Sequence, residues 1–260
     1  MERVLFGVAA LAVCLAAAGC ASDGGDGMSS GLVRAASVSG DAASAAGEEG
    51  AAAALYERAW KADPSVSVGV RWGRALRQAG DPKAATLAMQ EVTRRFPSDA
   101  AGLTELGRCA MAGGYTSEAT AAFSGAVAAR GAGWATFMAN GAFLAGQGRD
   151  ADAEASFRTA GADARSGTER YSALANLAML KAQRGDLRGG LADMQAIAAH
   201  PDAAPKVQAD LALLYGLSGD RAGFAHAAQQ AMLPPEEVEQ VGRWLEGTDG
   251  GDAAPRHRAR

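Results

Sequence analysis

The chain has 260 residues, enough for one large or two small domains with a sizeable core. Its net charge of -4 at pH 7 argues against a general nucleic-acid binder, which normally presents a basic face. Hydrophobic residues make up 48% of the chain but aromatic residues only 6%, so alanine supplies much of the apolar content. Because alanine is the best helix former, the composition predicts an all-α protein.

The N-terminal stretch MERVLFGVAALAVCLAAAGC is typical of a secretory signal sequence. Its uncharged stretch from Val4 to Ala18 is shorter than the roughly 20 residues that a membrane-spanning helix needs. Small residues then lead to Cys20, and this segment resembles the lipobox of bacterial lipoproteins, although Ala17 stands where a leucine is usual. The resemblance implies that residues 1–19 are a signal peptide and that Cys20 is lipidated as the first residue of the mature protein.

Two other interpretations of the N-terminus stay open: an ordinary secretory signal cleaved near Cys20, and a retained membrane anchor. Residues 20–47 are rich in Ser, Gly, Ala and Asp, and such a composition buries too little apolar surface to offset the entropy of ordering. We therefore expect a lipidated, disordered tether. By the sorting rule of bacterial lipoproteins, Ala21 and Ser22 imply the periplasmic face of the outer membrane.

Residues 48–246 carry a repeat. Gly73, Gly107 and Gly141 follow one another at intervals of 34 residues, and four further series of residues keep the same step. The units contain the tetratricopeptide-repeat (TPR) pattern, in which a Leu-Gly of the first helix is followed by Ala-x3-Phe in the second. The pattern predicts an all-α TPR solenoid with about five helix pairs between Ser67 and Leu233, followed by a capping helix.

A second series of glycines is expected to turn the chain between paired helices as left-handed C-caps: Gly80, Gly114, Gly148, Gly185 and Gly219. Between the third and fourth units the step is 37 residues, and a loop at Ala164–Arg170 is expected to absorb the difference. Upstream, Ala52 and Tyr56 belong to the second half of a unit that lacks a clear first half. Residues 247–260 are expected to be a disordered tail, with arginines that are solvated or touch anionic lipid.

The sequence contains no motif for catalysis or metal binding. The histidines lack a carboxylate or cysteine at ligand spacing, and no nucleophile elbow, phosphate loop or H-E-x-x-H occurs. We therefore expect no enzyme activity, no cofactor and no metal. With Cys14 removed and Cys20 lipidated, Cys109 is the remaining thiol, expected as a small core residue without a disulfide.

Without a motif for catalysis or metal binding, the function that we expect is protein binding. In TPR proteins the first helices of the repeats line a groove that binds the partner. The candidate groove residues are Arg71, Arg74, Arg77, Arg108, Met111, Met138 and Met179. A groove that is basic at one end and methionine-lined beyond suits an extended or helical partner segment with an acidic or carboxylate end. The alternative is a solvated arginine face and methionines that fill the core. The lysine–asparagine clamp of chaperone-tail-binding members is not visible.

The run from His200 to Leu245 carries a narrower resemblance. Its PDAAPKV, LAL-x3-L-x-GD and LPPEEV segments are similar to the C-terminal end of the TPR lipoproteins of the tight-adherence (Tad), or Flp pilus, assembly system. With the lipobox and the alanine-rich tether, the resemblance covers nearly the whole chain. Phe224 departs from it, because the family usually has alanine there.

The resemblance implies an outer-membrane accessory that helps the secretin channel of the pilus machine to assemble or localise. Its partners would be the secretin and other pilus-assembly subunits. A TPR lipoprotein scaffold for another envelope complex, such as barrel assembly, cell-wall enzymes or a different pilus, is the alternative. A soluble cytoplasmic adaptor is a third possibility, which fails if the signal sequence is real.

Replacing Cys20 tests the lipoprotein assignment. The wild type is expected in the outer-membrane fraction with the intact mass of a cleaved, acylated chain, whereas Cys20→Ala stays unprocessed because it lacks the acylated thiol. Mass spectrometry of both proteins after membrane fractionation measures this. An unmodified, soluble wild type would contradict the assignment.

Overall fold

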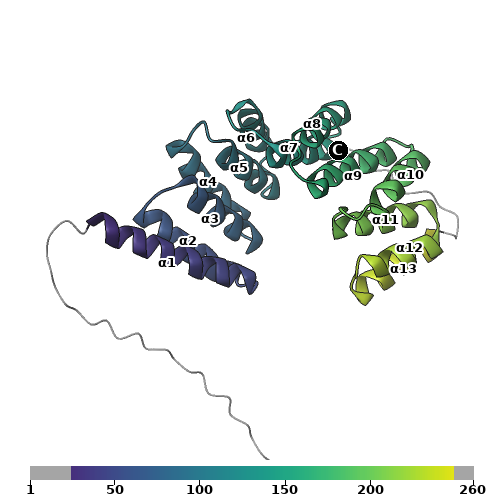
Figure 1. The fold of residues 1–260 in the computed structure, drawn as a ribbon, viewed down its shortest axis with the longest axis horizontal. Coiled ribbons are helices and arrows are strands. Elements are labelled where there is room, and N and C mark those ends of the chain that lie inside the picture. The colour runs from purple at the N-terminus through teal and green to yellow at the C-terminus, as the bar shows by residue number, and fades with distance from the viewer. Residues whose placement is uncertain (1–24, 249–260) are drawn as a thin grey trace, which may run out of the picture.

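The computed structural model describes residues 25–248, which form thirteen α-helices and no β-strand. The helices are α1 (Gly25–Ala45), α2 (Glu49–Ala62), α3 (Val66–Gln78), α4 (Pro82–Arg95), α5 (Ala100–Ala112), α6 (Thr116–Ala128), α7 (Trp134–Gly146), α8 (Asp150–Asp163), α9 (Gly167–Gln183), α10 (Leu187–Ala198), α11 (Pro205–Ser218), α12 (Arg221–Gln230) and α13 (Pro235–Thr248). They follow one another along an open arch from α1 to α13 (Figure 1). The predicted all-α class is confirmed.

The helices pack in consecutive pairs. Each odd-numbered helix from α1 to α11 contacts the even-numbered helix after it, and each pair contacts the next. From α3 to α11 the first helices of successive pairs also contact one another, so they line the inner side of the arch. The five predicted pairs, α3/α4 to α11/α12, are confirmed, and α13 follows them as predicted.

Glycines with positive φ turn the chain within each pair. At Gly80 φ is 83°, and the amide of Asp81 donates to the carbonyl of Leu76 at 3.0 Å, which closes α3. The Asp81 carboxylate then accepts a hydrogen bond from the Ala84 amide at 2.9 Å and caps α4. The same backbone conformation occurs at all five predicted turn glycines and also between α1 and α2: Gly47, Gly80, Gly114, Gly148, Gly185 and Gly219.

In four of the pairs, a glycine of the first helix packs directly against a large side chain of the second helix. A Cβ atom added to Gly107 of α5 would lie 2.8 Å from the Phe123 ring of α6, which is almost completely buried. Large side chains lie equally close to the corresponding glycines of neighbouring pairs: Tyr56 at Gly40, Met89 at Gly73 and Phe157 at Gly141. The repeat of 34 residues is therefore the spacing of this contact along the chain.

The prediction of a disordered tether at residues 20–47 is wrong for Gly25–Ala45, which form α1. Gly40 packs on Tyr56 as Gly73 packs on Met89, with 16 residues between partners in both cases. The Tyr56 hydroxyl also donates to Asp41 at 2.7 Å. The composition argument failed because it considered this segment alone. Its small residues contribute little apolar surface themselves, but a tyrosine of the next helix covers them and so stabilises the helix. The solenoid thus begins before residue 48, whereas Cys20 lies outside the described residues.

The additional residues of the fourth unit do not lie in a loop. Helix α9 has 17 residues against 13 in α7, so the insertion lengthens the helix at its N-terminus. The Ser166 hydroxyl accepts from the Glu169 amide at 3.2 Å, and the Glu169 carboxylate accepts from the Arg165 amide at 2.7 Å. This reciprocal capping starts the helix early, and its Ser-x-x-Glu signature is present in the sequence.

The C-terminal end is closed by α13. Val238 and Val241 pack against the last core cluster, which includes Leu214 and Phe224, so the predicted capping helix is confirmed. The side chains of Trp244 and Leu245, also predicted in its apolar stripe, lie outside those that the structure describes, as do residues 249–260 of the expected tail.

Substituting Gly107 tests the close approach between paired helices. Gly107→Ala is expected to lower the free energy of unfolding by about 1–3 kcal/mol, because the buried Phe123 ring must move. The control is Gly125→Ala in α6, whose new Cβ would meet Leu103 at an ordinary 3.5 Å. It is expected to stabilise by about 0.5–1 kcal/mol through helix propensity. Urea denaturation measures both, and equal effects would contradict the packing argument.

Candidate protein-binding groove

One residue of each first helix lies just after the glycine or alanine that packs on the second helix. These residues, here called the groove row, are Asp41, Arg74, Arg108, Ala142, Met179 and Leu213. Neighbouring members line the same hollows: Asp41 and Arg74 one, Arg74 and Arg108 the next, and Ala142 and Met179 a third. The groove row is therefore charged toward α1 and apolar toward α11.

The predicted arginines fall into two groups. Arg74 is exposed, lines two of these hollows and makes no ion pair within residues 25–248. Arg71 lies beside it on α3 and contacts the Asp41 carboxylate at 3.3 Å, with both side chains largely in solvent. Arg74 is thus the predicted arginine that is available to a ligand.

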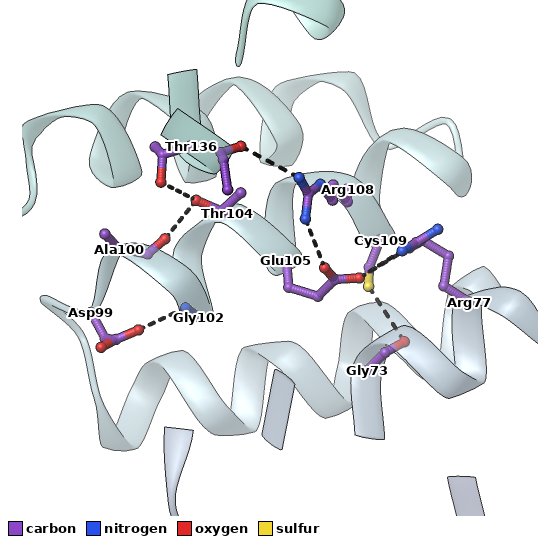
Figure 2. A network of polar contacts seen from close by, with 11 residues as sticks. Gly73, Arg77, Asp99, Ala100, Gly102, Thr104, Glu105, Arg108, Cys109 and Thr136 are labelled. Atoms are coloured by element: carbon purple, nitrogen blue, oxygen red, sulfur yellow. Dashed lines mark hydrogen bonds and ion pairs between the residues drawn. The ribbon is translucent and has the colours of Figure 1, made fainter. Parts of the chain in front are cut away.

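Arg77 and Arg108 instead converge on a buried carboxylate, that of Glu105, which is 1% exposed (Figure 2). Arg77 donates from Nε and Nη2 to Glu105 Oε1 at 3.1 and 2.9 Å, and Arg108 donates from Nη1 to Oε2 at 3.3 Å. Arg108 also donates to the Ala135 carbonyl of α7 at 3.4 Å. We call this group the Glu105 clamp; it joins three successive first helices.

The Glu105 clamp was not found from the sequence. Glu105 occupies a helix position next to Leu106-Gly107, and a lone acidic residue there gives no sign of burial until Arg77 of the preceding unit is placed against it. Its spacing from Arg108 is the one signal available, because residues three apart share a helix face. With one carboxylate against two guanidinium groups, the clamp itself carries a net positive charge, and Asp163, Arg165 and Glu169 also line the hollow beside it.

The hollow beside the clamp has a volume of about 320 Å³ and rigid walls. The Thr104 and Thr136 hydroxyls, on α5 and α7, lie 3.0 Å apart in the interior (Figure 2). The Trp134 indole donates to the Glu169 carbonyl at 3.0 Å, and the Trp134 amide donates to Asp163 at 2.7 Å. Because the Thr104–Thr136 and Trp134–Glu169 bonds cross between units, the hollow is formed before any partner binds.

The predicted methionines occupy three different environments. Met111 is exposed near the C-terminal end of α5, and Met179 lines a hollow with Ala142. Met138 packs on the central core, and the Asn176 amide lies 3.8 Å from its sulfur, so it mainly fills the core as the alternative interpretation had it. Two further apolar side chains that the sequence analysis missed, Leu213 and Leu217 of α11, are nearly half exposed one helical turn apart.

Cys109 is fully buried, with Sγ 3.7 Å from the Gly73 carbonyl oxygen, and burial raises the pKa of its thiol to about 12. The expectation of a free core cysteine is confirmed. Residues 25–248 hold no cluster of His, Cys, Asp and Glu suited to a metal ion. No helix among them has the length and apolarity to cross a bilayer.

No protein-family model matches the sequence, and no curated protein is detectably similar to it. Solved structures do match. A tetratricopeptide repeat protein from Parabacteroides merdae superimposes with a TM-score of 0.63 over 84% of this chain and 87% of its own, at 12% identity. The fold is a TPR solenoid.

Two further solved structures share this fold. PilW, described as a widely conserved type IV pilus biogenesis factor, matches with a TM-score of 0.59 at 18% identity, over 71% of this chain and 86% of its own. PilF of Pseudomonas aeruginosa matches with a TM-score of 0.60 at 15% identity, over 85% of this chain and all of its own. A chain of the APC/C Cut9–Hcn1 hetero-tetramer also matches, with a TM-score of 0.66 at 12% identity over 85% of the present chain. The present chain spans 45% of that longer chain, which is less than half of its length.

Neutralising Glu105 tests the clamp. Glu105→Gln keeps the shape of the side chain but removes the charge that two arginines share, so the free energy of unfolding is expected to fall by about 1.5–3 kcal/mol. The control is Asp152→Asn, which breaks the exposed Arg149–Asp152 pair and is expected to change stability by less than about 0.5 kcal/mol. Chemical denaturation measures both; similar losses would mean that the clamp contributes no more than a surface pair.

Proposed function

We propose that this protein is a lipid-anchored TPR scaffold that binds subunits of a pilus-assembly machine at the periplasmic face of the outer membrane. The observation that carries the proposal is the preformed groove, whose row of side chains changes from charged at Arg74 to apolar at Met179 and Leu213. A scaffold without enzyme activity fits this chemistry, since the groove gathers binding side chains rather than an acid, a base and a nucleophile.

The groove defines the chemistry of its partner. Arg74 supplies an unpaired guanidinium for a carboxylate, either an acidic side chain or a chain terminus. Met179, Leu213 and Leu217 supply adaptable apolar contacts three to four units further along. A partner segment with an acidic end and aliphatic side chains beyond it satisfies both regions.

The pilus machine is proposed to be of the Tad type, with the secretin as the main partner. The resemblance of the His200–Leu245 run supports this choice, and the lipobox ending at Cys20 supports the membrane address. The likeness of the fold to PilW favours a second candidate, an assembly factor of a type IV pilus. Both candidates share the groove and the anchor and differ in the machine that they serve.

Complementation of a deletion strain tests the function. Wild-type protein is expected to restore secretin multimers in the outer membrane and to co-purify with the Tad secretin after cross-linking. Arg74→Glu is expected to weaken that association about tenfold or more, because a charge-assisted hydrogen bond becomes a repulsion. The control, Arg58→Glu, reverses an exposed charge on α2, the second helix of its pair.

The cross-linked partner decides between the candidates. Recovery of a type IV pilus secretin in place of the Tad secretin would favour the second candidate. Recovery of barrel-assembly or cell-wall proteins would contradict both. Equal effects of Arg74→Glu and Arg58→Glu would show that the groove is not the binding surface.

A further inference from the structure

Helix α1 has one face on α2 and leaves the opposite face uncovered. Val33, Ala36, Gly40 and Ala43 recur at helical spacing on the packed face. The opposite face, here called the outer face, consists of exposed residues only: Gly31, Leu32, Ala35, Val38, Ser39 and Ala42. None of these side chains is charged, and the exposed Arg34 borders this face one helical turn before Val38.

In the next unit the corresponding surface is an interface. Trp72 and Ala75 of α3 occupy the positions of Ser39 and Ala42, and they pack against the core around Tyr56 of the preceding pair. No described residue precedes α1, so within residues 25–248 the outer face is the end of the stack. Its two large side chains, Leu32 and Val38, are 55% and 62% exposed.

The other end of the stack is different. The exposed residues of α13 include Glu236, Glu239, Gln240 and Arg243, which give that helix a polar, charged surface. Terminal units of a solenoid normally carry such a surface because they face water. The uncharged outer face of α1 is therefore suited to an environment other than bulk water.

The length of chain between α1 and the proposed anchor identifies that environment. Four residues lie between Cys20 and Gly25, and a fully extended chain spans at most about 18 Å over that distance. Helix α1 itself is about 31 Å long at 1.5 Å per residue. A lipid chain on Cys20 thus keeps the N-terminus of α1 closer to the membrane surface than α1 is long.

We propose that the outer face of α1 lies on the lipid surface that carries the anchor, and so holds the solenoid against the membrane. The inference rests on the proposed lipidation of Cys20. Contact at the headgroup level would bury Leu32 and Val38 without removing any charge from water. The acyl chain provides the affinity for the membrane, and the outer face sets the orientation of the solenoid on it. A weak contact of the outer face is sufficient because the anchor already holds the protein at the membrane, which makes the contact effectively intramolecular.

This arrangement leaves the groove accessible. Asp41, the first member of the groove row, lies on α1 but outside the outer face, where it receives the Tyr56 hydroxyl and Arg71. The membrane therefore covers the end of the stack, and the partner binds along its inner side.

A fluorescent probe on each of two single cysteines tests the orientation. Val38→Cys lies on the outer face, and the control Leu87→Cys lies on α4 with similar exposure, 59%. The full-length acylated proteins are labelled with an environment-sensitive dye and reconstituted into phosphatidylethanolamine–phosphatidylglycerol vesicles that contain spin-labelled lipid. Cys109 stays unlabelled because it is fully buried.

The expected result is about a twofold or greater loss of fluorescence at residue 38 and almost none at residue 87, since a spin label quenches a dye held at the lipid surface. Equal quenching at the two sites in floated vesicles would overturn the proposal and leave the lipoprotein assignment intact. Cross-linking between residues 38 of two molecules would also overturn it, in favour of a second copy on the outer face. Failure of the wild type to float with the vesicles would contradict acylation, and the proposal with it.

Discussion

The contact between a small residue of the first helix and a large side chain of the second, 16 residues later, sets the geometry of this solenoid. At Gly40, Gly73, Gly107 and Gly141 this side chain lies so close that an added methyl group has no room. Because that approach fixes how each first helix is rotated, the next residue along is aimed into the groove. The groove row is thus a consequence of core packing, and its chemistry varies while its position is constant.

The same contact explains what was predictable from the sequence. Five helix pairs repeat the turn glycine with a nearly constant step, and the first four of them also repeat the small–large spacing, so their positions followed from periodicity alone. The pair α1/α2 keeps the spacing, with Gly40 before Tyr56, but precedes the next pair by 33 residues. Helix α1 was therefore not predicted, because its composition is of low complexity and its step to the next pair differs from 34 residues. Its stability depends on the tertiary contact with Tyr56. The capping signal at Ser166 shows that local chemistry can move a helix boundary against the repeat.

The candidate groove shows where single-sequence reasoning ends. Spacing placed all seven predicted residues on first helices, which is where the structure has them. It did not tell which side chains are already paired within the molecule. Arg77 and Arg108 are engaged by Glu105, whereas Arg74, on the same helix as Arg77, is free of ion pairs within the described residues. That distinction depends on a neighbouring unit and on burial, neither of which a helical periodicity encodes.

The Glu105 clamp also bears on how the stack comes apart. In a solenoid each unit contacts only its neighbours, so local opening can be confined to one unit. Here the Glu105 carboxylate accepts hydrogen bonds from Arg77 of α3 and from Arg108 of α5. Arg108 also donates to a backbone carbonyl of α7. Opening any one of these three units breaks bonds that belong to the others, so we expect α3 to α7 to open as one cooperative block in hydrogen exchange. The units beyond α9 have no such buried ionic link among the described residues, and we expect their amides to exchange through smaller, independent openings.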